Sequence, residues 1–324
     1  MSAKVEKVSI VMCTYNGERF LKQQLDSIIN QTYPIHEILI QDDNSNDNTQ
    51  KIIKEFQQLH PKIKFSINKG ERGINNNFFN LIFKASGDLI AISDQDDIWD
   101  HDKIKKMMEA IGPNLMCLCR SIAFREDGSF DPYDIRMPNY HLIRMIYISV
   151  NGHNMIFRKE LLQYLPEDPL QYGYLYDHIL SFTAASLESI AEVNEPLVKF
   201  RRHNNAATYS NFDKYRTKSV SHAFYILTWS LINFRKIKPL VNTYYKRKLK
   251  LLQDIKSKNA TKEDALRIME YEAGLRKPFL IGLAKYHYKY NDVLFYTKGN
   301  GLSNKIRSLL YGIMHLYNFK HLMN

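Results

Sequence analysis

Short apolar runs and amphipathic segments alternate along the first half of the chain. Four runs have the length and composition of buried strands: residues 8–12, 37–40, 62–67 and 88–93. Between them, apolar residues recur at the three- and four-residue spacing of amphipathic helices over residues 20–29, 52–56 and 76–85. Strands that alternate with helices predict an α/β fold, with a mostly parallel sheet flanked by helices.

The last third of the chain has a different pattern. Apolar residues between positions 306 and 317 repeat every three or four residues, which places them on one face of a helix: Ile306, Leu309, Leu310, Ile313, Leu316 and Tyr317. Such a stripe belongs either to a core or to a surface that lies on a membrane. We therefore divide the chain into an α/β domain over residues 1–210 and a mainly helical region over residues 211–324.

The composition is that of an ordinary folded protein. Hydrophobic residues make up 44% of the 324 residues and charged residues 24%, which excludes a disordered, collagenous or coiled-coil chain. Three cysteines are too few for a disulfide framework or a four-ligand zinc site. Because we find neither a secretory signal nor a stretch apolar enough to span a membrane, we expect a cytoplasmic protein.

Charge is divided unevenly between the two regions. Residues 1–210 carry 23 Lys and Arg against 27 Asp and Glu, whereas residues 211–324 carry 22 against 7, a net of +15. A block this basic faces nucleic acid, an anionic membrane surface or only water. The chain has no zinc-finger spacing and no RNP-type aromatic signature, so we expect no nucleic-acid partner. Basic residues interleaved with apolar and aromatic ones favour a peripheral position on a membrane.

Polar residues gather where the predicted strands end. Three groups follow the first, second and fourth strands: Thr14 and Asn16; Asp42 and Asp43; and Asp94, Asp96 and Asp97. In parallel sheets, ligands bind beyond the carboxyl ends of the strands. The second group alone could serve as helix caps, but the crowding in the third exceeds what capping needs. Hard cations such as Mg²⁺ or Mn²⁺ prefer carboxylate oxygens and accept substrate phosphates, so the pattern predicts metal-assisted handling of a phosphorylated ligand.

Two other phosphate-binding classes are excluded by their missing motifs. The chain contains neither a GxxxxGK[ST] loop nor a GxGxxG loop, which argues against a P-loop NTPase and a dinucleotide oxidoreductase.

Four segments carry motifs in a fixed order. They read VSIVMCTYNG at residues 8–17, QDDNSNDNT at 41–49, GDLIAISDQDDIW at 87–99 and NEPLVKFRRH at 194–203. In this order they resemble glycosyltransferase family 2, and SDQDDIW is similar to bacterial members that build surface polysaccharides, including rhamnosyltransferase-like enzymes. The resemblance implies a Rossmann-like GT-A fold, a nucleotide-diphosphate sugar donor, a divalent metal, either Mn²⁺ or Mg²⁺, and inversion at the anomeric carbon.

The resemblance also assigns residues to the nucleotide. Thr14 and Asn16 would lie along it, and Asp42 or Asp43 would hydrogen-bond the base. The family usually has a glycine in the turn after these aspartates, where this chain has Asn44. Asparagine tolerates a left-handed backbone, so we expect the turn to be preserved.

A second set of residues is assigned to the diphosphate. Asp94 and Asp96 match the family's DxD element and would meet the ribose and the metal-bound diphosphate, with Asp97 as a neighbour. Arg201 and His203 resemble the YRxH element that closes over the diphosphate, and His203 would also meet the metal. The alternative for His203 is an exposed basic turn.

The acceptor side is assigned to the segment after residue 150. Gly152 resembles the acceptor-side loop, and Asp177 stands where the family places its catalytic base. An inverting transfer needs such a base to take a proton from the acceptor hydroxyl. Tyr176 precedes Asp177 where the family often has Glu or His, and a helix cap is the alternative role for the carboxylate. We expect His153 and His178 to be structural or acceptor-side residues rather than ligands.

The sequence therefore predicts an inverting, metal-dependent glycosyltransferase. It would use a UDP- or dTDP-sugar and extend a surface glycan such as capsule or O-antigen, carried on a lipid, at the inner face of the plasma membrane. One alternative is a sugar nucleotidyltransferase, which usually shows a Gly- and Lys/Arg-rich loop that residues 14–18 lack. The other is a non-enzymatic basic binding protein, which would have no reason to gather Asp94, Asp96 and Asp177.

Overall fold

The computed structural model describes residues 5–125, 127–131, 139–203, 220–295 and 301–323. The chain separates into two compact units. The first consists of residues 1–135, 149–184 and 189–206, and the second of residues 136–148, 185–188 and 207–324. Two short segments that precede residue 210 thus group with the helical unit, and the domain boundary at residue 210 stays a prediction.

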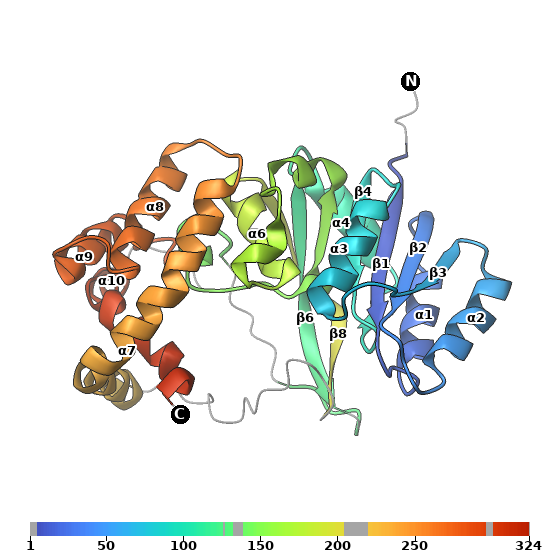
Figure 1. Cartoon of the computed structure of the whole chain (residues 1–324), viewed down its shortest axis with the longest axis horizontal. Helices are drawn as coiled ribbons and strands as arrows, with labels where there is room; N and C mark the ends of the chain where they lie inside the picture. The colour runs from blue at the N-terminus through green and yellow to red at the C-terminus, as the bar shows by residue number, and fades with distance from the viewer. Residues whose placement is uncertain (1–4, 126, 132–138, 204–219, 296–300, 324) are drawn as a thin grey trace. The chain divides into compact units, whose positions relative to one another are not determined.

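The first unit is built on one eight-stranded sheet (Figure 1). Its strands are β1 (Val8–Thr14), β2 (Ile35–Asp42), β3 (Ile63–Ile67), β4 (Leu89–Ser93), β5 (Ile98–Trp99), β6 (Met116–Arg125), β7 (Met155–Arg158) and β8 (Ile190–Arg202). They lie in the order β3-β2-β1-β4-β7-β6-β8-β5. The four strands from β3 to β4 are mutually parallel, β7 is antiparallel to both neighbours, β6 and β8 are parallel, and β5 is antiparallel to β8.

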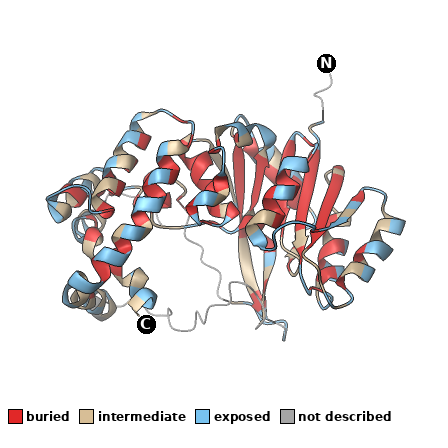
Figure 2. Cartoon of the chain, viewed as in Figure 1, coloured by how far each residue is buried: buried red, intermediate tan, exposed pale blue. Residues whose placement is uncertain are grey.

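Helices of the first unit pack against this sheet. They are α1 (Leu21–Ile29), α2 (Thr49–Leu59), α3 (Ile74–Lys84), α4 (Lys103–Ile111) and α6 (Tyr176–Ser186), with 3₁₀ turns η1 (Gly152–Asn154), η2 (Lys159–Tyr164) and η3 (Pro169–Tyr172). The central strands are buried on both faces (Figure 2), as their continuous apolar runs predict. The α/β fold expected from the sequence, a mostly parallel sheet flanked by helices and followed by a helical region, is confirmed.

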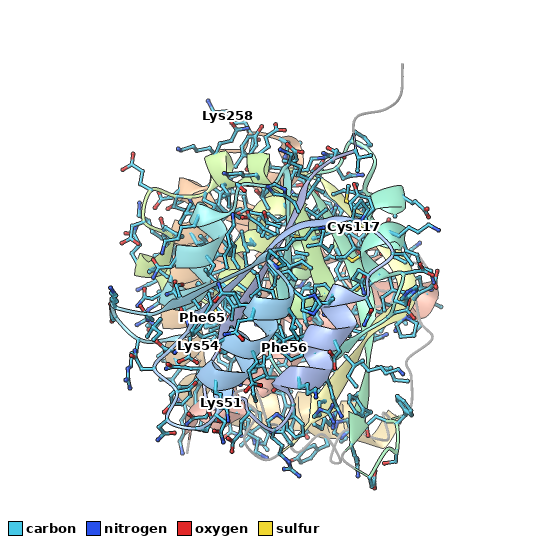
Figure 3. The ribbon with its side chains drawn as sticks, turned by 90° about the vertical axis from the view of Figure 1, so that its right-hand side faces the viewer. Lys51, Lys54, Phe56, Phe65, Cys117 and Lys258 are labelled. Atoms are coloured by element: carbon cyan, nitrogen blue, oxygen red, sulfur yellow. The ribbon has the colours of Figure 1, made fainter. Side chains whose placement is uncertain are left out.

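Helix α2 illustrates how the apolar pattern produces this packing. Its Phe56 and the neighbouring Phe65 of β3 pack against the sheet core (Figure 3). Lys51 and Lys54, on the other face of α2, are exposed. The three- and four-residue spacing of apolar positions thus turns one helical face to the sheet and the other to water.

The second unit is helical. Its elements are α5 (Leu142–Met145), α7 (Val220–Asp254), α8 (Ala260–Glu272), α9 (Phe279–Lys289), α10 (Leu302–Met314) and the 3₁₀ turns of η5 (His315–Met323). Lys248 of α7 is buried, and its Nζ donates to the carbonyl oxygens of Met145 (3.1 Å) and Ile146 (2.6 Å) at the end of α5. Among the described residues, no helix combines the length and the apolar character needed to cross a bilayer.

A buried polar cluster joins several helices of the second unit. Tyr147 Oη donates to Glu272 Oε1 (3.2 Å) and lies 2.7 Å from His287 Nε2, while His315 Nε2 lies 3.3 Å from the same Glu272 oxygen. Lys238 Nζ donates to the Glu272 backbone carbonyl at 2.8 Å. Burial lowers the pKa of His287 to about 3. Burial alone would raise the pKa of Glu272, but its interactions with His315 and Lys238 outweigh burial and lower that pKa to about 2.

Candidate active site

The carboxyl ends of β2, β1 and β4 meet at one edge of the sheet. Thr14, the last residue of β1, pairs with Asp42 in the sheet register, and Thr14 Oγ1 donates to Asp42 Oδ1 at 2.8 Å. Asp42 is fully buried and also accepts from Ser45 N (2.7 Å), Ser45 Oγ (2.5 Å) and Gln50 Nε2 (2.9 Å). The Asn16 N–H donates to Ser45 Oγ at 2.8 Å. Asp42 thus stabilises the turn that joins these two loops.

Asp43 is the more accessible of the two aspartates after β2. Its Oδ1 accepts from Asn68 Nδ2 at 2.8 Å and its Oδ2 from the Gly73 N–H at 3.0 Å, but the side chain is only half-buried. The next residue, Asn44, has a φ of 63°, so the left-handed conformation expected at this position is confirmed.

Beyond β4, a histidine bridges two aspartates. His153 Nδ1 lies 2.9 Å from Asp94 Oδ2 and 3.2 Å from Asp97 Oδ2, and its Nε2 lies 3.3 Å from Ser121 Oγ. Burial raises the pKa of Asp97 to about 7. Burial alone would lower the pKa of His153, but the Asp97 and Asp94 carboxylates outweigh burial and raise it. The ring also stacks on Phe200, with the centroids 5.2 Å apart.

A buried lysine completes this arrangement. Lys103, the first residue of α4, donates from Nζ to the backbone carbonyl of His153 at 2.7 Å and lies 3.4 Å from the centre of the Trp99 ring. Burial lowers its pKa to about 8. The sequence predicts neither the ion pair between His153 and Asp97 nor the hydrogen bond from Lys103 to His153. In both cases the two partners lie at least 50 residues apart along the chain.

Asp96 contacts His203 and Arg201, whereas Asp94 contacts His153. His203 Nε2 lies 2.8 Å from Asp96 Oδ2, and Arg201 Nε donates to the Asp96 backbone carbonyl at 2.9 Å. Both side chains lie against Phe20, whose ring centroid is 5.0 Å from the His203 ring and 4.4 Å from the Arg201 guanidinium carbon. Burial and the nearby Asp94 raise the pKa of Asp96. Arg201 and His203, at and just after the end of β8, therefore both contact Asp96.

Asp177 lies in the first turn of α6 and faces the same site. Its Oδ1 accepts from the His178 N–H at 2.7 Å, and the Gly152 backbone N–H also bonds the carboxylate. Burial and the Asp94 charge raise the pKa of Asp177 to about 6. Gly152 packs so closely that a Cβ there would lie 2.2 Å from Tyr176 Oη. A side chain at position 152 would therefore displace the ring of Tyr176, the residue before Asp177.

The carboxylates and histidines form a ligand set suited to a hard divalent cation. Donor atoms of Asp94, Asp97 and His153 lie within 4.8 Å of one another. However, Asp97 and His153 are buried, whereas Asp94, Asp96 and His203 are partly exposed. A cation that also binds a substrate phosphate needs ligands that reach solvent. Asp94 reaches solvent and could hold such a cation, and the buried pair can orient Asp94 from behind.

Comparison with known proteins finds glycosyltransferases among those similar to this chain. Residues 9–165 match the family described as Glycosyl transferase family 2. The dTDP-rhamnosyl transferase RfbG of Shigella flexneri is 44% identical over 106 residues, which cover 31% of this chain and 36% of that protein. The UDP-Glc:alpha-D-GlcNAc-diphosphoundecaprenol beta-1,3-glucosyltransferase WfgD of Escherichia coli is 35% identical over 107 residues, which cover 33% of this chain and 42% of that protein. The matches to the first three curated relatives span between about a third and two thirds of those proteins.

Solved structures match the fold over almost the whole chain. The S. aureus TarS 1–349 structure in complex with UDP-GlcNAc has a TM-score of 0.57 at 15% identity, covering 98% of this chain and 92% of that one. The mannosyltransferase PcManGT from Pyrobaculum calidifontis, in complex with GDP-Man and Mn²⁺, has a TM-score of 0.52 at 16% identity, covering 97% and 86%. The matched segment at residues 9–165, the ordered motifs and the fold shared with these structures make the chain similar to glycosyltransferase family 2.

Proposed function

We propose that this chain is an inverting, metal-dependent glycosyltransferase that moves a sugar from a nucleotide-diphosphate donor to a hydroxyl of a growing surface glycan. The observation that carries the proposal is that candidate metal ligands and a candidate catalytic base lie at the same edge of the sheet. Asp94 and Asp96 reach solvent, and His203 contacts Asp96. Asp177, which has a raised pKa, lies close enough to be influenced by the Asp94 charge.

The nucleotide is proposed to bind along the ends of β1 and β2. Thr14 and Asn16 line this edge, and Asp43 is the better candidate for hydrogen bonding to the base. Asp42 is fully buried and its carboxylate bonds Thr14 and its own turn, which leaves it a structural role. The donors in the names of RfbG and WfgD, a dTDP-sugar and a UDP-sugar, support a pyrimidine nucleotide.

The cation is proposed to be Mn²⁺ or Mg²⁺, held by Asp94, Asp96 and His203. Such an ion would act as a Lewis acid that neutralises charge on the departing diphosphate. Arg201, which lies beside Asp96, is proposed to bind the same phosphates through its guanidinium. The PcManGT structure, which is a complex with GDP-Man and Mn²⁺, supports a metal-assisted donor site.

Asp177 is proposed to be the catalytic base. A general base works best when its pKa lies near the working pH, and burial brings the pKa of Asp177 to about 6. The carboxylate is thus mostly ionised at pH 7 yet more basic than an exposed aspartate. In an inverting displacement it would take the proton of the acceptor hydroxyl as the new glycosidic bond forms and the bond to diphosphate breaks.

The acceptor is proposed to be lipid-linked. WfgD is named for a sugar acceptor on diphosphoundecaprenol, which supports an acceptor of this chemistry. We propose that the chain works in the cytoplasm, as a peripheral protein at the anionic inner face of the plasma membrane, and that it has no nucleic-acid partner. The net charge of +15 over residues 211–324 supports this location.

Calorimetry with UDP and with dTDP, each with and without Mn²⁺, tests the donor site. We expect metal-dependent binding that Asp96→Ala abolishes, while Asp26→Ala, which removes an exposed carboxylate of α1, leaves binding unchanged. Binding that is indifferent to Mn²⁺ and to Asp96→Ala would reject the metal role.

The reaction itself is tested with a panel of nucleotide sugars. Slow release of nucleoside diphosphate from one donor would identify the sugar, even with the acceptor unknown. Release of pyrophosphate from a nucleoside triphosphate and a sugar phosphate would instead identify a sugar nucleotidyltransferase.

A further inference from the structure

Helix α10 packs on the other helices through its small and polar face. Ser308 and Gly312, one turn apart, are buried. Gly312 meets α9 closely, since a Cβ there would lie 3.0 Å from Leu283 Cδ1. The inward face of this amphipathic helix is therefore not its apolar face.

The apolar side chains of α10 lie on the opposite side. We call them the α10 stripe: Leu302, Ile306, Leu309, Leu310 and Ile313. The first four are between 39% and 74% exposed, and Ile313 is half-buried. At about 100° of helical rotation per residue the five fall within one third of the helix surface, turned away from Ser308 and Gly312. A helix that turns five aliphatic side chains outward needs an apolar partner, because leaving them in water is costly.

Positive charge flanks this stripe on both sides. Lys305 and Arg307 lie at its two edges by the same helical rotation, and Lys320 follows in η5. Residues 293–324 contain four Lys and Arg and no Asp or Glu. Long basic side chains can rest their stems along an apolar surface while the charged ends reach outward.

We propose that the α10 stripe is a docking surface for an anionic lipid bilayer. The helix would lie in the plane of the interface, with the stripe at the boundary of the acyl chains and Lys305 and Arg307 among the lipid phosphates. Charge decides between this partner and a second copy of the chain. Two regions that each carry a net +15 repel one another, whereas anionic lipids attract them.

This inference deepens the proposed membrane location and names the surface responsible. A glycosyltransferase whose acceptor is carried on a lipid gains from being held at that lipid's surface, because both partners are then confined to the same thin layer. The binding itself requires neither donor nor acceptor, so it can be measured separately from sugar transfer.

Vesicle flotation of the full chain tests the inference. The double variant Ile306→Ser with Leu309→Ser removes half of the exposed stripe at positions where the side chains face water. The matched control, Leu59→Ser with Phe83→Ser, removes two exposed apolar side chains from α2 and α3 of the first unit. Each protein is mixed with vesicles of phosphatidylcholine and phosphatidylglycerol, and with vesicles of phosphatidylcholine alone, at low and high salt.

We expect the native chain and the matched control to float with the phosphatidylglycerol vesicles, and added salt to weaken this binding. The stripe variant should bind at least tenfold more weakly. Equal binding by the stripe variant and the control, equal binding to both vesicle types, or no binding by the native chain would overturn the inference. So would a dimer of the native chain that the stripe variant loses, since the partner would then be a second copy. Calorimetry of the stripe variant with nucleotide and Mn²⁺ tests the donor site independently of the membrane. It therefore distinguishes a failure of the membrane-docking proposal from a failure of the proposed glycosyltransferase function.

Discussion

His153 Nδ1 lies 2.9 Å from Asp94 Oδ2, while the same nitrogen lies 3.2 Å from the fully buried Asp97. The imidazole therefore ties a solvent-reaching carboxylate to a buried one. In metal sites, such partners orient the ligand carboxylate, and their loss commonly weakens metal binding tenfold or more.

His153→Ala should therefore have two effects. Asp94 loses its orienting partner, so Mn²⁺-dependent nucleotide affinity should fall about tenfold in calorimetry. Asp97 is left buried without its partner, so the free energy of unfolding in urea should fall by about 3 kcal/mol.

A second substitution checks the stability argument. The double variant His153→Ala with Asp97→Asn no longer has a buried carboxylate at position 97 that lacks its histidine partner. It should therefore recover part of the lost stability without restoring nucleotide affinity. If His153→Ala leaves both stability and affinity unchanged, the pairing has no role in the site.

The pKa of Asp177 sets the expected pH dependence of transfer. The carboxylate must be ionised to accept a proton, so kcat/KM should fall as the pH drops through about 6. Asp177→Asn should retain donor binding and lose transfer by about 10²-fold or more. A pH profile measured from pH 5 to 8, together with calorimetry of the variant, checks both points. Unchanged turnover in Asp177→Asn would remove it as the base.

Gly152 packs against Tyr176, which precedes Asp177 at the start of α6. The added methyl of Gly152→Ala would meet Tyr176 Oη at 2.2 Å, so the Tyr176 side chain must shift, and we expect this shift to disturb Asp177. Because small displacements of a reacting group are costly, we expect transfer to fall about 10²-fold while donor affinity is preserved. Tyr176→Phe removes the clashing oxygen, and the double variant should regain part of the activity. Equal activity of Gly152→Ala and the native enzyme would show that the loop at Gly152 tolerates this movement.

Acid should destabilise the helical unit through His287. The pKa of His287 is lowered to about 3 in the folded protein, below the value of about 6.5 expected when unfolded. The unfolded chain therefore binds more protons, and stability should decrease as the pH falls below about 6.5, by up to about 1.4 kcal/mol per pH unit. Glu272, with a pKa of about 2, adds a loss of the same sign below about pH 4.5.

Tryptophan fluorescence can follow this unit separately. The chain has two tryptophans, and Trp99→Phe leaves only Trp229 in α7. We compare urea midpoints at pH 7 and pH 5 in Trp99→Phe with and without His287→Gln, which cannot gain a proton. The loss between the two pH values should be smaller in the His287→Gln protein. An identical loss in both would assign the acid sensitivity to other groups.

The sequence by itself determined the alternating strands and helices of the first unit, because strands appear as short continuous apolar runs and helices as apolar residues repeated every three or four positions. It also located Asp94 and Asp96 at a strand end and predicted the left-handed turn at Asn44, since these depend on neighbours along the chain. Element ends shifted by a few residues: β1, expected over residues 8–12, continues to Thr14. Hydrogen bonds to β2 extend this strand past the apolar run.

Only the tertiary structure decided which side chains meet. It brought His153 and Lys103 to the acidic segment, buried Asp42 while leaving Asp43 accessible, and turned the α10 stripe outward. The spacing of apolar residues along a helix predicts that the helix has an apolar face, but it does not predict which other element packs against that face. Contacts between residues distant in sequence depend on how whole elements pack, and the burial that shifts the pKa of Asp97, Asp177 and His287 arises only from that packing.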